Sequence, residues 1–326
     1  MRRREFITLL GGAAATWPVV GRAQQPAVPV VGFLSGVSRD TYGFALRPFR
    51  EGLSEIGYVE DRNVVIIYRW EGGQDALPGL AADLVRRQVT VIVASGNSQA
   101  LAAKAATTTI PIVFLSGNDP VELGLVASLN KPGGNLTGVT TLGGVLTLKR
   151  LELVHEVVPT ATIIAHLVNP ANPTTAETQT KELQIAARAL GLQLHIVHAT
   201  SDRDIGTVFD TLARLHAGAL LIAPDGFLIS RSEQLASLAL RHTVPAFFQN
   251  REFAAAGGLI SYGGSSADAW HLVGAYTGRM LKGEKPRDLP VQQATKVELV
   301  INLQTARTLG VDVPQTLLAR ADEVIE

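Results

Sequence analysis

Polar residues follow short apolar runs at several points of the chain, and their types suit hydrogen bonding to a small ligand. Ser-Gly-Asn-Ser at 95–98 opens an Ala-rich stretch, and the free N–H groups at the start of a helix can hold a carboxylate. Each of these polar residues could instead serve only as a helix cap. Taken together, they predict a ligand site formed by Ser35, Ser95, Gly96, Asn97, Ser98, Ser116, Asp119, Asn169, Asn172, Asp225, Gln249 and Tyr262.

Covalent chemistry has weaker support. The run Gly32–Gly36 resembles a turn that presents a nucleophilic serine, but its spacing differs from G-x-S-x-G, and the sequence singles out no histidine or acid as a partner for Ser35. Neither a dinucleotide-binding nor a P-loop glycine motif occurs. His195 and His198 lie three apart on a predicted strand, so they point to opposite faces, which argues against a shared metal. We expect no catalytic residue, no metal and no cofactor.

The elements that must position the polar residues alternate regularly. Apolar, β-branched runs alternate with Ala- and Leu-rich stretches, which predicts βαβ units with right-handed crossovers. The runs are apolar on both faces, as is typical of strands buried in a parallel sheet. The predicted strands are 30–35, 64–69, 89–95, 111–116, 138–141, 162–169, 193–198, 219–223, 246–249 and 259–262. The predicted helices are 43–56, 74–87, 99–107, 121–129, 175–190, 205–216, 231–241 and 267–281.

The two halves of the chain follow one plan. Thr-Ile-Pro-Ile-Val-Phe at 109–114 parallels Thr-Val-Pro-Ala-Phe-Phe at 243–248, and a Gly-Gly pair precedes a strand in each half, at 133–134 and 257–258. The predicted fold class is therefore α/β, with two doubly wound parallel-sheet lobes. The carboxyl ends of parallel strands meet at one edge of each sheet, and a cleft between two such edges is a natural ligand site.

Composition excludes several classes of protein. The 326 residues are 46% hydrophobic and 18% charged, which suits roughly two folded domains. Lys plus Arg and Asp plus Glu both total 29, and no basic block follows the first residues, so we expect no nucleic-acid partner. The chain contains no Cys, which excludes disulfides, thiolate zinc sites and Cys nucleophiles.

The first 23 residues have the pattern of a secretory signal peptide. Arg2, Arg3 and Arg4 precede an apolar stretch, and the small residues Gly21 and Ala23 allow cleavage near Ala23. The Arg-Arg-Glu-Phe-Ile run resembles the twin-arginine export signal, and an ordinary Sec signal is the alternative. The apolar stretch is shorter than the roughly 20 residues of a membrane-spanning helix. We expect the mature protein in the periplasm.

The whole chain resembles the ABC-transporter substrate-binding protein family that includes tryptophan- and tyrosine-type binding proteins. The resemblance rests on RRREFITLLGGAAA at 2–15, VGFLS at 31–35, LAADLVRRQVTVIVASG at 80–96, ATTTIPIVF at 106–114, LNKPGGNLTGVT at 129–140, ARALGLQLHIV at 187–197, REFAAAGGLISYG at 251–263, YTGRMLKGEKPRDLPVQQ at 276–293 and LLARADEVIE at 317–326. It implies the type I periplasmic binding protein fold, in which three hinge crossovers join the lobes. Lobe one would comprise 27–142 and 263–288, and lobe two 143–262 and 289–326.

The resemblance also implies a function. The chain would be the exported receptor of an ABC importer, closing over a small ligand and docking, as a monomer, on a membrane permease. An amino acid or a related aromatic or organic acid is the expected ligand, with its carboxylate near 95–98 and Asp119 and its ammonium at Asp225. Asn169 and Gln249 would add neutral hydrogen bonds. A ligand-sensing module for a sensor kinase and an exported α/β hydrolase that uses Ser35 remain alternatives.

Overall fold

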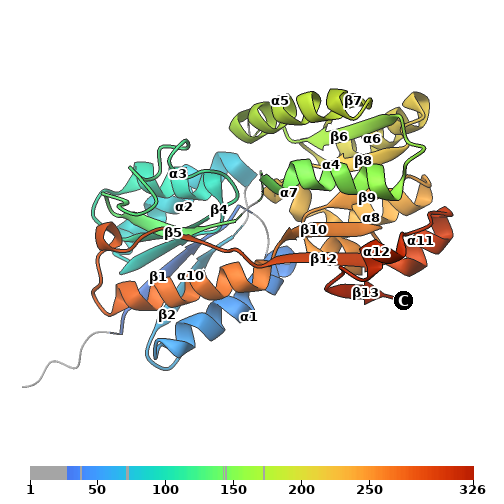
Figure 1. The fold of residues 1–326 in the computed structure, drawn as a ribbon. Helices are drawn as coiled ribbons and strands as arrows, with labels where there is room; N and C mark the ends of the chain where they lie inside the picture. The colour runs from blue at the N-terminus through green and yellow to red at the C-terminus, as the bar shows by residue number, and fades with distance from the viewer. Residues whose placement is uncertain (1–27, 37–38, 71–72, 142, 144, 172) are drawn as a thin grey trace, which may run out of the picture.

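The computed structural model describes residues 28–36, 39–70, 73–141, 143, 145–171 and 173–326. The predicted signal segment and the candidate ligand residue Asn172 lie outside these ranges. The described residues form two lobes, each a parallel or mostly parallel sheet covered by helices on both faces (Figure 1). This arrangement confirms the predicted α/β class and the two-lobe architecture. Within these residues, no helix combines the length and apolarity needed to cross a bilayer.

The first lobe is built on a six-stranded sheet in which every strand pair is parallel. Both faces of this sheet are covered, which explains why its central strands are apolar on both sides. Across the sheet the strands are β11 (Gln292–Gln293), β5 (Leu136–Thr140), β4 (Ile112–Ser116), β3 (Val91–Ala94), β1 (Val30–Leu34) and β2 (Val65–Arg69). One face is covered by α2 (Gly73–Arg86) and α3 (Asn97–Ala106), and the other by α1 (Arg39–Glu55) and α10 (Ser266–Leu281).

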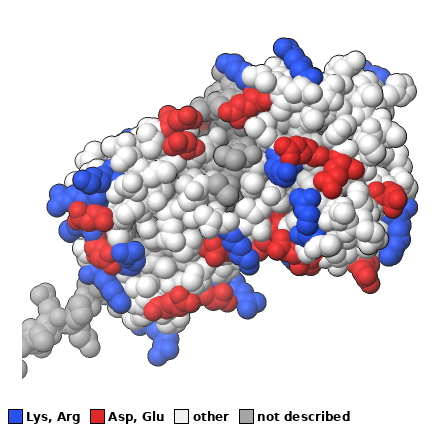
Figure 2. All heavy atoms as spheres, in the orientation of Figure 1, with Lys and Arg blue, Asp and Glu red and all other residues white. Residues whose placement is uncertain are grey.

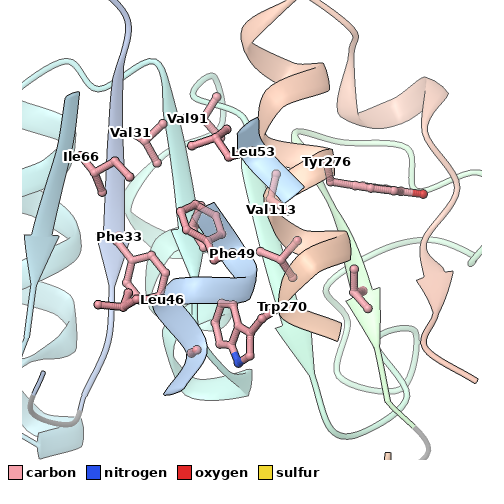
Figure 3. Close-up of a cluster of buried hydrophobic side chains, with 14 of the residues drawn as sticks. Val31, Phe33, Leu46, Phe49, Leu53, Ile66, Val91, Val113, Trp270 and Tyr276 are labelled. Atoms are coloured by element: carbon pink, nitrogen blue, oxygen red, sulfur yellow. The ribbon is translucent and has the colours of Figure 1, made fainter. Parts of the chain in front are cut away.

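Helix α10 follows most of the second lobe in sequence and yet completes the core of the first. It packs along α1 so closely that a Cβ atom on Gly274 would lie 2.0 Å from the carbonyl oxygen of Phe49. The cluster beneath the two helices contains Phe33, Phe49 and Trp270, all fully buried (Figure 3). Burial of these large rings gives the first lobe much of its hydrophobic stabilisation.

The second lobe is built on a seven-stranded sheet. Across the sheet the strands are β13 (Glu323–Ile325), β12 (Val297–Asn302), β10 (Ile260–Gly264), β9 (Ala246–Phe248), β8 (Ala219–Ile222), β6 (Ile163–Val168) and β7 (Gln193–His198). The helices packed on it are α4 (Val145–Val157), α5 (Pro173–Ala189), α6 (Asp202–Leu215), α8 (Ser232–Arg241), α9 (Arg251–Ala255), α11 (Leu303–Leu309) and α12 (Gln315–Leu318). The short helix α7 (Gly226–Ile229) directly follows the end of β8.

The chain passes between the lobes three times, after β5, after β10 and between β11 and β12. These passages are neighbours: a Cβ on Gly264 would lie 3.7 Å from the Cβ of Thr141, and the Ser265 N–H donates to the Lys296 carbonyl at 2.8 Å. Strand β10 ends where the chain leaves the second lobe, and β12 begins where the chain returns to it. The two strands therefore pair antiparallel, whereas the other pairs of the sheet are parallel. These three adjacent passages form a narrow band that is a suitable hinge.

The guanidinium of Arg150, from α4, supports this band. It is fully buried and donates to the carbonyls of Gly143 (3.1 Å) and Tyr262 (2.9 Å) and to the Thr147 hydroxyl (2.6 Å). Burial lowers the pKa of Arg150 to about 9. One side chain thus joins the first passage to the strand that leads into the second.

The structure differs from several sequence predictions. The predicted helix at 121–129 is wrong: the segment forms turns, and Gly124 has a φ of +66° that ends any helical run. Helices α4, α7, α9, α11 and α12 and strands β11, β12 and β13 were not predicted. The lobe boundaries 142/143, 262/263 and 288/289 stay predictions. Strand pairing adds that Gly263 and Gly264 belong to the second sheet and Gln292 and Gln293 to the first.

Candidate functional site

A cavity of about 630 Å³ lies between the carboxyl ends of the two sheets. Both lobes contribute to its wall, through the turns after the strands and through α1, α3 and α10. Of the twelve residues predicted for a ligand site, seven line the cavity: Ser95, Gly96, Asn97, Ser98, Asn169, Asp225 and Gln249. The structure therefore brings together residues up to 154 positions apart in sequence, from Ser95 to Gln249.

Four predicted residues lie elsewhere. Ser35 is fully buried, its N–H donates to the Arg69 carbonyl, and it is not among the residues that line the cavity. Asp119 is exposed and its carboxylate accepts from the N–H of Val121 at 2.7 Å, which makes it a turn cap. Tyr262 packs against the core of the second lobe. Ser116, also buried, lies behind the wall and contacts a lining residue.

That lining residue is Asn97, in the first turn of α3. The Ser116 hydroxyl donates to its Oδ1 at 2.8 Å, and its Nδ2 donates to Oδ1 of Asn118 at 2.8 Å. Gly96 is the N-cap of α3 and supplies no side chain to bond the first N–H groups of the helix. The start of α3 is thus held rigidly at the cavity wall, and its positive dipole end is directed at the space where a ligand would lie.

Aromatic rings form the neighbouring part of the first-lobe wall. Tyr42 and Phe44 of α1 lie with their ring centroids 5.1 Å apart, and Trp270 of α10 meets Tyr42 edge-on at 5.5 Å. The Tyr42 hydroxyl donates to the Ser95 carbonyl at 3.1 Å. Burial, with a smaller effect of the Glu252 carboxylate, raises the pKa of Tyr42 well above its usual value, so this donor stays protonated.

The second-lobe wall is centred on Asp225, which is 6% exposed. Its Oδ1 accepts from Nδ2 of Asn169 at 3.0 Å and from the N–H groups of Phe227 and Leu228 at 2.9 and 3.2 Å. Asp225 is therefore the N-cap of α7 and a cavity residue at once. These contacts fix the direction of the carboxylate.

Asn250 supplies a second acceptor on the same wall. Its Nδ2 donates to the Ser232 hydroxyl at 3.0 Å, and that hydroxyl itself donates to the Ile229 carbonyl at 2.7 Å. The amide is therefore oriented with Oδ1 away from Ser232. Among the described residues this buried oxygen has no hydrogen-bond partner.

The charged residues that the structure places along the cavity are Asp75, Asp225 and Arg231. Arg231 is engaged locally: its Nε donates to Asp202 at 2.5 Å and its guanidinium lies 5.5 Å from the centre of the Phe227 ring. The outer surface mixes both signs of charge on the face that Figure 2 shows. In the part of the chain that the structure describes, no three His, Asp or Glu side chains are grouped to hold a metal.

The cavity wall also contains residues outside the predicted ligand site. Among them are the aromatic residues Tyr42, Phe44 and Phe227, whereas the Trp70 ring packs on Phe33 and Tyr68 inside the first lobe. Trp270, Thr141, Ser266 and Arg231 line the cavity as well and were not predicted. Trp270 and Ser266 are four residues apart on one face of α10, a helix whose place in the first lobe depends on the hinge.

The cleft and the two lobes match known proteins over nearly the whole chain. A tyrosine-binding protein of Clostridioides difficile is 25% identical over 86% of this chain and 80% of its own length. A conserved domain protein from Vibrio cholerae is 27% identical with a TM-score of 0.84, and an ABC domain from Streptococcus pneumonia in complex with L-Trp is 26% identical with a TM-score of 0.83. Each structural match covers 91% of this chain and 99% of the other.

A family model settles the classification. The model described as ABC transporter substrate binding protein matches residues 27–325, nearly all of the chain that follows the predicted signal segment. This match confirms the family that the sequence resemblance indicated. The chain belongs to the ABC transporter substrate-binding protein family.

Proposed function

We propose that this protein is the periplasmic receptor of an ABC importer and that its ligand is an amino acid with an aromatic side chain. One observation carries the proposal: a single cavity between the lobes combines a helix N-terminus, an aromatic wall and an opposing carboxylate. These three features suit the carboxylate, the ring and the ammonium of one small molecule. The relatives named for tyrosine binding and solved with L-Trp support the same ligand class.

The start of α3, at Gly96–Ser98, would hold the ligand carboxylate through backbone N–H groups. Asp225 would accept from the ammonium in a charge-assisted hydrogen bond, and Oδ1 of Asn250 offers a neutral acceptor beside it. Asn169 holds the Asp225 carboxylate in place. Tyr42 and Phe44 would contact the aromatic side chain, an arrangement that gains both apolar burial and ring contacts.

Transport requires that the ligand change the shape of the receptor. A ligand that contacts α3 in the first lobe and Asp225 in the second stabilises the closed arrangement over the open one by its differential affinity. The three adjacent passages between the lobes provide the hinge. A membrane permease would then recognise the closed form.

The export route is part of the proposal. Met1–Ala23 would direct the precursor to the twin-arginine system, and cleavage near Ala23 would release a monomer into the periplasm. Replacement of Arg3 and Arg4 with Lys tests this route. The precursor should then stay in the cytoplasmic fraction, whereas normal delivery of the variant would argue for Sec.

A thermal-shift panel on residues 24–326 tests the ligand class. A ligand that binds only the native state raises the unfolding temperature. At a ligand concentration of 100 times Kd, the free energy of unfolding rises by about 2.7 kcal/mol. L-Trp, L-Tyr and L-Phe should raise it, and L-Lys and L-Glu at equal concentration should not. A larger shift with a charged or small amino acid would reject the aromatic class.

A further inference from the structure

Trp270 has an unusual position for a core residue. It is 1% exposed, and its ring stacks on Phe33 at 5.6 Å with an interplanar angle of 29°. The same ring lines the ligand cavity. It therefore lies at the boundary between the apolar core of the first lobe and the cleft.

The indole nitrogen of Trp270 lacks a partner. Nε1 makes no hydrogen bond to any residue in the described ranges. The neighbouring polar groups, namely the hydroxyls of Tyr42, Tyr276 and Thr277 and the N–H of Asp268, all have hydrogen-bond partners. Figure 3 shows the ring at the end of the cluster toward which β1 runs from Val31 to Phe33, with the nitrogen pointing beyond that end. The carboxyl ends of the strands, and hence the cavity, lie in that direction. An indole N–H can only donate, so this group can serve an acceptor that enters the cavity.

A second donor group lies close by. Trp270 meets Tyr42 edge-on, and the Tyr42 hydroxyl bonds to the carbonyl of Ser95, the residue directly before the Gly96 N-cap of α3. The first N–H groups of α3 receive no bond from a cap side chain. Two sets of donors, the start of a ten-residue helix and the indole N–H of Trp270, are therefore joined through Tyr42 at the same wall.

We propose that the indole N–H of Trp270 donates a hydrogen bond to the ligand carboxylate, alongside the N–H groups of α3. The inference rests on the proposed function and adds a residue that determines specificity: Trp270 requires an acceptor at this end of the ligand. The acidic lining residue of the opposite lobe, Asp225, is assigned to the ammonium, so the two charged ends of an amino acid are read by different lobes.

Calorimetric titration of Trp270→Phe tests the assignment. Phe keeps an aromatic ring against Phe33 and Tyr42 and removes only the donor and part of the ring. The probes are L-Trp and tryptamine, which lacks the carboxylate; L-Tyr with tyramine, or L-Phe with phenethylamine, replaces them if that amino acid binds more tightly. Affinity for the amino acid should fall about 10- to 100-fold, and affinity for the amine should change less than about 2-fold.

Trp70→Phe is the matched control, because Trp70 also packs on Phe33 but lies outside the cavity wall. It should leave both affinities unchanged. If Trp270→Phe fails to fold, Trp270→3-benzothienylalanine, introduced by codon suppression, replaces the N–H by sulfur at nearly constant ring size and should give the same selective loss.

The outcomes separate the two proposals. An equal loss for the amino acid and the amine would show that Trp270 acts through packing alone, which overturns the donor assignment and leaves the proposed function intact. No measurable binding of L-Trp, L-Tyr or L-Phe to the wild-type protein would contradict both.

Discussion

The Asp225 carboxylate caps a helix and faces a ligand cavity, so its two roles can be separated by one substitution. In Asp225→Asn, Oδ1 can still accept from Phe227 and Leu228, and Asn is nearly as good a cap as Asp. The negative charge is lost. A charge-assisted hydrogen bond contributes about 1.5–3 kcal/mol, so affinity for the amino acid should fall about 10- to 150-fold with little change in unfolding temperature.

Calorimetric titration and thermal unfolding of the same sample measure the two effects. Asp119→Asn is the control, since Asp119 is also an Asp cap but is exposed and outside the cavity wall. It should bind as the wild type does. Equal affinity of Asp225→Asn and wild type would reduce Asp225 to a structural cap.

His166 should make the stability of the second lobe depend on pH. Burial, reinforced by the nearby positive charge of Arg150, lowers the pKa of His166 to about 4, whereas an unfolded His titrates near 6.5. Between these values the unfolded chain binds a proton that the native protein does not. The free energy of unfolding should therefore fall as the pH falls from about 6.5 to 4, by up to about 1.4 kcal/mol per pH unit from this group.

Urea unfolding at a series of pH values checks the contribution. His166→Gln should reduce the slope in this window, and His198→Gln, which changes an exposed histidine, should keep it. If the wild type and His166→Gln have parallel pH profiles, His166 takes up a proton as readily in the native protein as in the unfolded chain, and the predicted linkage is wrong.

At the scale of elements, the contact of α1 with α10 depends on glycine. A Cβ on Gly274 would lie 2.0 Å from the Phe49 carbonyl oxygen, and backbone atoms cannot yield as a flexible side chain can. Gly274→Ala should force the helices apart and destabilise the protein by about 1–3 kcal/mol. Chemical denaturation measures the loss.

Gly43→Ala is the paired control on α1. A Cβ there has no neighbour within 4 Å, so better helix propensity should stabilise the protein by up to about 1 kcal/mol. If both variants were equally stable, the close approach of α1 and α10 would not constrain the fold.

The elements show why some predictions succeeded. Strands such as β3 and β8 are buried on both faces, and their continuous apolar runs are distinct in the sequence. The Ser-Gly-Asn-Ser turn was informative because it follows such a strand at the carboxyl edge, where βα turns meet. In contrast, β11 is two residues long and is defined only by its pairing with β5. The false helix at 121–129 had helical composition, but Gly124 adopts a left-handed conformation within it.

The missed cavity residues have a common cause. Trp270 lies in an apolar helix, and its sequence neighbours give no sign that it differs from a core residue. Its place in the cavity follows from the return of the chain to the first lobe and from packing against Phe33, some 237 positions earlier in the sequence. Such non-local geometry is not contained in periodicity or in turn composition.

At the scale of the whole molecule, the proposed function requires that ligand binding and hinge motion be coupled. The ligand is expected to join α3 of one lobe to Asp225 of the other, while three adjacent passages and the buried Arg150 guanidinium keep the lobes connected. Arg150 bonds to the carbonyl of Gly143 in the first passage and to that of Tyr262 in β10, so the first passage should move as one unit with the strand that leads into the second. Closure should therefore be a hinge rotation that leaves each lobe unchanged internally.

The absence of Cys from the sequence allows this motion to be measured directly. Leu101 on α3 and Ile185 on α5 are exposed and lie on different lobes, so Leu101→Cys with Ile185→Cys permits one spin label on each lobe. Leu101→Cys with Val65→Cys, both within the first lobe, is the control pair. Pulsed electron–electron double resonance then reports the label separation with and without a saturating aromatic amino acid. On ligand addition, the label separation between the lobes should shorten, while the separation within the first lobe should stay constant. Saturated binding with an unchanged distance between the lobes would contradict a receptor that closes over its ligand.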